Sequence, residues 1–164
     1  MKRTPVSFDE YMAIREIVFE WGDGYDNKDW SRFRNILAPT VKMDYSIVGH
    51  VVIENMPAEE VVAMMSAPEF LGDPLVRTQH LMGASKYERI SDTEILGYHQ
   101  IRAAHQRYTG PDHSEVADKG HGHAVVKHWY KKIEGVWKLS GIAPNIYWNE
   151  HNFDLIFPGL KVEH

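Results

Sequence analysis

Several histidines stand where strands would point them into a shared interior. Ten His occur among 164 residues. His80 begins a segment with two-residue alternation, and His99 and His105 share parity with Ile101 in the next such segment. Because side chains of one parity face one side of a strand, an inward Ile101 would bring both histidines inward. Imidazole titrates near neutrality, so these residues are candidates for proton transfer, although a single buried histidine is more often a hydrogen-bonded structural group.

Two Asp/Tyr pairs, Tyr25-Asp26 and Asp44-Tyr45, carry complementary chemistry. A phenol donates a hydrogen bond, so two phenols in a dry pocket could polarise a carbonyl group. A carboxylate beside an imidazole would set its tautomer and support its protonated form. Tyrosines at the ends of elements also extend their hydroxyls to water, and the spacing leaves both interpretations open.

A His-x-His pattern at His121 and His123 suggests metal ligation, because imidazoles at i and i+2 lie on one strand face. A third ligand would have to come from the acidic residues between 112 and 118, and no recognised spacing links them. Parity also places the two histidines on the face opposite Ala124 and Val126. We therefore predict no metal site.

Periodicity indicates which elements position these residues. Ser7 and Glu10 have the spacing of a capping box at a helix start. Apolar residues then recur at steps of three and four, which predicts one amphipathic helix: Phe8, Tyr11, Ile14, Val18, Trp21 and Tyr25. Gly22 and Gly24 weaken its end, so we expect Tyr25 and Asp26 at its C-terminal edge.

The next segment is read as a helix, a strand and a helix. Residues 30–37 have helical spacing, and we expect that helix to end before Pro39. Residues 41–45 alternate apolar and polar side chains as a short strand would. Pro57 followed by Ala58 and two glutamates is typical of a helix start.

From about Arg77 the period changes to two, in four segments rich in Tyr, Val, Ile, Trp and His: 78–90, 94–108, 120–133 and 136–148. Turn residues separate them, most clearly Ser91-Asp92 and Glu134-Gly135. Helices followed by antiparallel hairpins indicate an α+β class rather than βαβ units. We predict one domain over 1–164, with a curved sheet closed by the N-terminal helices into a cone-shaped barrel.

Composition excludes several classes of function. The net charge is -5 and the pI about 6.0, so no basic surface is available for nucleic acid. There is no Cys, which excludes disulfides and thiolate catalysis. No stretch is apolar enough for a membrane span or a signal peptide, so we expect a cytoplasmic protein, with a vesicular site in pigment synthesis as the alternative.

Seven runs of residues resemble the fungal scytalone dehydratase family, in order, from about Phe8 to Phe157: 20–30, 56–60, 71–74, 77–80, 97–100, 105–108 and 128–132. The resemblance implies the cone-shaped α+β fold of nuclear transport factor 2 and a homotrimer. It also implies no metal or organic cofactor and a small aromatic polyketide as substrate, since the family dehydrates scytalone and vermelone in melanin biosynthesis.

The resemblance also assigns roles to residues of this chain. Tyr25 and Tyr45 would polarise the substrate carbonyl, and His80, oriented by Asp26, would be the acid and base. His105 would position the leaving hydroxyl. The implied pocket lining is mostly apolar: Trp21, Met64, Phe70, Ile101, Ala124, Val126, Ile142, Pro144, Ile146, Phe153 and Phe157. The C-terminal segment, about 149–164, would act as its lid.

One departure concerns substrate specificity. The family has Ser and Asn on the strand before the 128–132 run, and this chain has Ala124 and Val126 there. A site that loses polar partners loses discrimination for a substrate hydroxyl. We therefore predict a dehydratase acting on a scytalone-like cyclic hydroxy-ketone in pigment or secondary metabolism. An isomerase, cyclase or pericyclic catalyst using the same pocket is the alternative, and a non-catalytic binder is a third reading.

Overall fold

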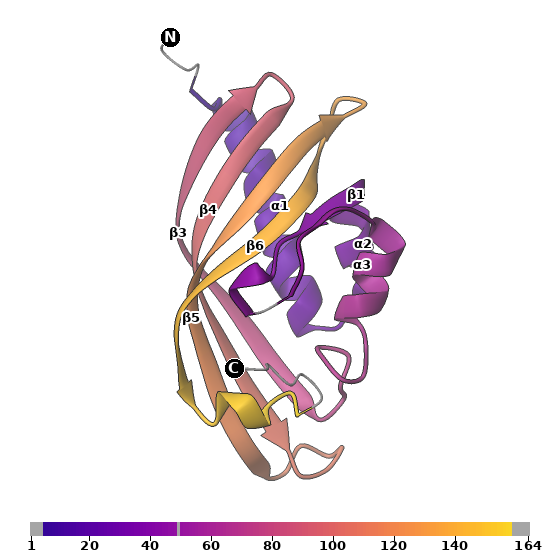
Figure 1. Cartoon of the computed structure of the whole chain (residues 1–164), viewed down its shortest axis with the longest axis vertical. Coiled ribbons are helices and arrows are strands. Elements are labelled where there is room, and N and C mark those ends of the chain that lie inside the picture. The colour runs from indigo at the N-terminus through magenta and orange to yellow at the C-terminus, as the bar shows by residue number, and fades with distance from the viewer. Residues whose placement is uncertain (1–4, 49, 159–164) are drawn as a thin grey trace.

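A computed structural model describes residues 5–48 and 50–158 of the chain (Figure 1). Within these residues the fold is a curved sheet with helices on its inner side, in the order β2-β1-β6-β5-β4-β3. All neighbouring strands are antiparallel except β1 and β6, which run parallel. The predicted α+β class with a mixed, curved sheet is confirmed.

Helix α1 (Phe8–Asp26) begins at the predicted capping box, where Ser7 and Glu10 satisfy each other's backbone N–H groups. Its inner face includes Ile14 and Trp21, which are 0% and 4% exposed. Gly22 and Gly24 do not end the helix early, and Tyr25 and Asp26 form its last turn as predicted. The sheet curves around α1, which lies against β3 and β6 (Figure 1).

Helix α2 (Trp30–Ile36) is shorter than predicted, because Leu37 is the first residue of strand β1 (Leu37–Met43). Pro39 lies within β1 instead of after a helix, and Tyr45 lies beyond the strand. The 3-10 turn η1 (Ser46–Val48) and strand β2 (Ile53–Pro57) were not predicted. Helix α3 (Ala58–Met65) starts where expected, after Pro57.

The four predicted long strands are confirmed, and each pairs antiparallel with the next in a continuous meander. They are β3 (Val76–Ser91), β4 (Glu94–Tyr108), β5 (Val116–Ile133) and β6 (Val136–His151). The turn at Glu134 and Gly135 has φ angles of 49° and 83°, as expected for a two-residue hairpin loop. A final 3-10 turn, η2 (Phe153–Leu155), crosses the end of β5.

The pairing of β4 with β5 decides which side chains share the interior. His105 lies opposite Gly120, Ile101 opposite Ala124 and His99 opposite Val126. His99 and His105 are 0% and 5% exposed, so the parity argument is confirmed for both. Among the described residues, no helix is long and apolar enough to cross a membrane.

Candidate functional site

The end of α1 brings an aromatic pair and a carboxylate into the interior. Trp21 and Tyr25 are one helical turn apart, so their rings lie on one face with centroids 5.2 Å apart. Tyr25 is 2% exposed. Asp26, the next residue, points toward β3.

The carboxylate of Asp26 holds His80 through backbone and side chain. Asp26 Oδ2 accepts the backbone N–H of His80 at 2.9 Å, and Oδ1 lies 2.6 Å from His80 Nδ1. The hydroxyl of Thr78 donates to the same Oδ1 at 3.0 Å. A carboxylate at Nδ1 fixes the Nδ1–H tautomer and stabilises the imidazolium, which leaves Nε2 of His80 free to exchange a proton.

His105 lies beside His80, with ring centroids 6.2 Å apart. The carbonyl oxygen of Gly120 is 3.2 Å from His105 Nδ1 and accepts a hydrogen bond from its N–H. In the neutral ring Nε2 is then a hydrogen-bond acceptor. Burial, and then the neighbouring His80, lower the pKa of His105 to about 4. His105 is therefore neutral near pH 7 and is suited to orienting a hydroxyl group rather than to acid catalysis.

Tyr25 and Tyr45 provide hydrogen-bond donors. Burial, with a smaller contribution from the Tyr45 phenol, raises the pKa of Tyr25 well above its ordinary value. Burial also raises the pKa of Tyr45. The Tyr25 hydroxyl and the Trp21 indole N–H are buried without a hydrogen-bond partner in the part of the chain that the structure describes. These protonated, unused donors can bind an oxygen atom of a ligand.

The five side chains Tyr25, Asp26, Tyr45, His80 and His105 are called the His80 cluster below. Its carboxylate-oriented imidazole suits general acid and base chemistry, and its two phenols, one buried and one partly buried, suit stabilisation of an oxyanion. Such chemistry fits the removal of a proton next to a carbonyl group.

Comparison with known sequences shows to which family the chain belongs. The family model described as scytalone dehydratase matches residues 5–162. The chain belongs to the scytalone dehydratase family. Scytalone dehydratase arp1 of Aspergillus fumigatus is 49% identical over 156 residues, which is 95% of this chain and 93% of that protein. Scytalone dehydratase of Pyricularia oryzae is 47% identical over 156 residues, 95% of this chain and 91% of that protein.

A solved structure confirms the fold expected from the family. The Kfla4162 protein from Kribbella flavida matches with a TM-score of 0.75 at 16% identity. The match covers 90% of this chain and 97% of that protein. At this level of identity the likeness concerns the fold alone, which is the cone-shaped α+β fold of the scytalone dehydratase family.

The C-terminal segment covers the His80 cluster. The rings of Phe153 and Phe157 lie 5.5 and 5.3 Å from that of His105. Phe157 also packs on Phe70, with centroids 5.0 Å apart. The close approach needs a glycine in β5, since a Cβ atom at Gly120 would lie 2.4 Å from the Cα of Phe153. Of the predicted lid, 149–164, the residues 159–164 lie outside the described part.

Charged contacts hold this segment in place. Arg107 Nε donates to the carbonyl oxygen of Ile156 at 2.9 Å. Its Nη2 forms an ion pair with Asp73 at 2.6 Å. These groups were not predicted, because an arginine on a strand is ordinarily a solvated residue and nothing in the spacing links it to residue 73.

Some of the other predicted lining residues are buried in the interior, and others are not. Val126 and Ile142 are 2% and 1% exposed, and Ala124 lies opposite both Ile101 and Ile146 across its two neighbouring strands. Two residues lie further out: Met64 is 37% exposed, and Pro144 borders a groove on the outer face of the sheet.

His99 does not join the His80 cluster, although it is buried as predicted. Its Nδ1 is 2.8 Å from the Ser85 hydroxyl and its Nε2 is 2.8 Å from the Tyr130 hydroxyl. The Tyr130 hydroxyl is also 3.0 Å from His128 Nδ1. Ser85, His99, His128 and Tyr130 form what we call the inner network. His128 and Tyr130 share parity with Val126 in the sequence. Ser85 comes opposite His99 only through a register shift in β3 after Met82, which the sequence does not predict.

The histidines on the outer face are separate from both groups. His123 stacks on Trp148 at 4.7 Å and lies 3.2 Å from a carboxylate oxygen of Glu150. Within 5–48 and 50–158, no cluster of three or more His, Asp or Glu side chains is arranged to hold a metal ion.

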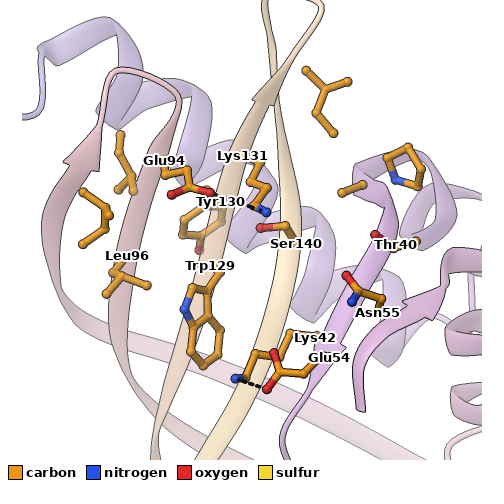
Figure 2. A pocket seen from close by; sticks show the side chains of 15 residues that line it. Thr40, Lys42, Glu54, Asn55, Glu94, Leu96, Trp129, Tyr130, Lys131 and Ser140 are labelled. Carbon is orange, nitrogen blue, oxygen red and sulfur yellow. Dashed lines mark hydrogen bonds and ion pairs between the residues drawn. The ribbon is translucent and has the colours of Figure 1, made fainter.

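A groove of about 600 Å³ also lies on the outer face (Figure 2). It is bordered by Trp129 and two ion pairs, Lys42–Glu54 at 2.8 Å and Lys131–Glu94 at 3.4 Å. No member of the His80 cluster lines it. The groove is therefore distinct from the candidate active site.

Proposed function

We propose that this chain is a dehydratase that removes water from a cyclic hydroxy-ketone of polyketide origin, in pigment or secondary metabolism. The observation that carries the proposal is the buried His80–Asp26 pair beside the unpartnered hydroxyl of Tyr25. Membership of the scytalone dehydratase family supports the same reaction class. No metal or organic cofactor is needed for the steps below.

The first step is proton abstraction. Nε2 of His80 takes the proton on the carbon next to the substrate carbonyl, and the electrons move toward the carbonyl oxygen. The hydroxyls of Tyr25 and Tyr45 donate hydrogen bonds to that oxygen as it becomes negative. Asp26 stabilises the imidazolium that results, because its charge lies 2.6 Å from Nδ1.

The second step is loss of the hydroxyl. The proton on His80 Nε2 passes to the departing hydroxyl on the same face of the ring, and water leaves as the double bond forms. One group thus serves as base and then acid, giving a syn elimination that ends in an aromatic ring. The neutral His105 lies 6.2 Å from His80 between ring centroids and is placed to orient the hydroxyl.

The substrate is scytalone-like with fewer polar groups beside Ala124 and Val126. Ala124 and Val126 offer apolar side chains where the family resemblance implies Ser and Asn. This replacement also favours one alternative function, an isomerase, cyclase or pericyclic catalyst, since such reactions depend on shape more than on hydroxyl recognition. Mass spectrometry separates the two, because only a dehydratase yields a product that is lighter by one water molecule.

We further propose that the chain forms a homotrimer and that its C-terminal segment opens and closes over the site. The outer face of the sheet exposes large apolar side chains, among them Tyr147 and Trp148, which are 59% and 54% exposed. Burial of such a patch in an interface is favourable. Light scattering should then give three times the chain mass of 19.0 kDa.

The direct test is turnover of scytalone by chelator-treated protein, followed through formation of trihydroxynaphthalene. The wild-type chain should remain active after metal removal, and His80→Ala should lower kcat by about 10³-fold, because general acid and base catalysis is lost. His121→Ala, on the outer face, is the matched control and should retain activity. Full activity of a folded His80→Ala protein would contradict the mechanism.

A further inference from the structure

The inner network leaves one polar atom unused. His128 and Tyr130 are 0% and 1% exposed, and Nδ1 of His128 is hydrogen-bonded to the Tyr130 hydroxyl. Nε2 of His128 is buried and has no hydrogen-bond partner among the described residues. Buried polar atoms are nearly always paired with protein, water or ligand, so this nitrogen marks a place where another polar atom belongs.

The His128 ring is connected to the His80 cluster through the ring of Trp21. The indole ring of Trp21 contacts the His128 ring at 4.7 Å and the Tyr25 ring at 5.2 Å. The Tyr25 hydroxyl is likewise buried and donates no hydrogen bond to the described residues, and the Trp21 N–H lies beside its oxygen and partly offsets the rise that burial causes in its pKa. The Tyr25 hydroxyl and His128 Nε2 are therefore two available polar groups on either side of the Trp21 ring, as would suit a ligand with more than one oxygen substituent.

The network can make Nε2 of His128 either a donor or an acceptor. In one arrangement Ser85 donates to His99 Nδ1 and His99 Nε2–H donates to the Tyr130 oxygen. The Tyr130 hydroxyl then donates to His128 Nδ1, and Nε2 carries the proton. If every bond is reversed, His128 Nδ1–H donates to Tyr130 and Nε2 becomes an acceptor. Each imidazole holds one proton in both arrangements.

Two further observations make this reversal easy. Burial lowers the pKa of His99 to about 4 and, with His99 nearby, that of His128 well below its ordinary value, so both rings are neutral near pH 7. Ser85, at the outer end of the network, is exposed and also lies within hydrogen-bonding reach of the Tyr87 hydroxyl. Water can therefore satisfy the serine hydroxyl whether it donates to His99 or accepts from it.

We propose that His128 Nε2 binds a ring oxygen of the polyketide and is a specificity-determining group, an inference that rests on the proposed function. Val126, two residues earlier on the same strand face, offers no polar contact. That oxygen is a phenol of the aromatic ring, distinct from the carbonyl oxygen bound by Tyr25 and Tyr45. A phenol both donates and accepts, so it can pair with Nε2 in either arrangement of the network.

The test compares two ligands that differ by one phenol and do not turn over. Dissociation constants for 1,3,8-trihydroxynaphthalene and 1,8-dihydroxynaphthalene are measured without oxygen for the wild type, His128→Phe and Ser140→Ala. The wild type should prefer the first ligand, and His128→Phe should reduce the preference about tenfold, the value of one hydrogen bond. Ser140→Ala is the matched control, because its hydroxyl is also buried and unpartnered but lies outside the network.

A second variant covers the case in which His128→Phe does not fold. Tyr130→Phe keeps the ring and removes only the hydroxyl that joins the histidines, and it should lower the preference in the same direction. Imidazole ¹⁵N spectra of the wild type should show the Nε2 signal of His128 changing when trihydroxynaphthalene binds.

The outcomes for the subsite and for the reaction can be separated. An unchanged preference in the folded variants, with no change of the His128 signal, overturns the subsite even if scytalone is dehydrated. A wild type that shows the preference and the signal change but releases no water from any scytalone-like hydroxy-ketone supports the subsite and contradicts the proposed function. A wild type that binds neither ligand overturns both.

Discussion

The His80 cluster and the inner network each place two histidines near a tyrosine in the interior, but only the first contains a carboxylate. Asp26 accepts from the Thr78 hydroxyl and the His80 backbone and holds the His80 ring. The inner network links Ser85, two neutral histidines and Tyr130 without any charged member. The difference shows that burial of histidine alone does not create an acid or base.

The carboxylate changes what a buried imidazole can do. The Nδ1–H of His80 donates to Asp26, so Nε2 is the atom that can take a proton from a substrate and return it. His99 and His128 lack such a partner, and burial disfavours their charged forms. They can redirect hydrogen bonds but are poorly suited to hold a substrate's proton. The first region therefore fits chemistry, and the second fits recognition.

The largest expected effect is loss of stability in acid. The pKa of His99 and of His105 is about 4 in the folded chain, below the value near 6.5 of an unfolded histidine. Between these values the unfolded chain binds more protons, so the free energy of unfolding falls as pH falls from about 6.5 toward 4. At pH 5 the loss should be about 2 kcal/mol for each of the two histidines.

Urea unfolding at pH 7 and pH 5 measures this loss, and glutamine variants separate the two regions. His99→Gln and His105→Gln should each reduce the pH dependence by a similar amount, whereas only His105→Gln should lower turnover of scytalone. His113→Gln, outside the core, is the control for the substitution. If turnover falls equally in the His99 and His105 variants, the division into a chemical region and a recognition region is wrong.

The second prediction concerns the cover over the His80 cluster. Gly120→Ala would place a Cβ atom 2.4 Å from the Cα of Phe153, so the C-terminal segment must move. Gly122→Ala is a matched control on the same strand face, since its nearest neighbour is the Asn149 side chain at 3.5 Å. We expect Gly120→Ala to destabilise the chain by about 1–3 kcal/mol and to raise KM, and Gly122→Ala to do neither.

Thermal unfolding and steady-state kinetics of the two alanine variants test this prediction. The inner network should be unaffected in both, so the His128 ¹⁵N signal of Gly120→Ala should match that of the wild type. Equal KM values for the two variants would indicate that the segment does not need its close contact with β5 to cover the site.

Local sequence patterns predicted the residue types of the site better than they predicted which of those residues lie together. The helical period placed Tyr25 and Asp26 correctly at the end of α1, because capping and amphipathic spacing act within a few residues. Strand parity predicted that His99 and His105 face the interior, but it did not predict which of them lies beside His80. That depends on β-sheet register, since Gly120 lies opposite His105 and Val126 opposite His99.

The errors in the predicted elements have similar causes. Leu37 has helical spacing from Phe33, yet it starts β1 because the parallel pairing with Leu139 of β6 overrides the local preference. Strand β2 has an exposed pattern with no alternation to detect. The contact of Arg107 with Ile156 joins residues 49 positions apart, and no local sequence pattern predicts it.

The smallest expected effect concerns the exposed end of the inner network. Ser85→Ala removes the hydroxyl at 2.8 Å from His99 Nδ1, but water can replace it because Ser85 is exposed. The free energy of unfolding should change by no more than about 0.5 kcal/mol. Tyr130→Phe removes a buried hydroxyl that serves two histidines, and it should cost about 1–3 kcal/mol.

Urea titrations of the two single variants and of the double variant measure this contrast. Removal of the Tyr130 hydroxyl separates the two histidines, so the effect of Ser85→Ala should be equally small with and without it. A loss of stability in Ser85→Ala as large as that in Tyr130→Phe would mean that the network needs a fixed serine donor. A fixed donor would hold His128 in one proton arrangement, and its Nε2 could then only donate to the phenol.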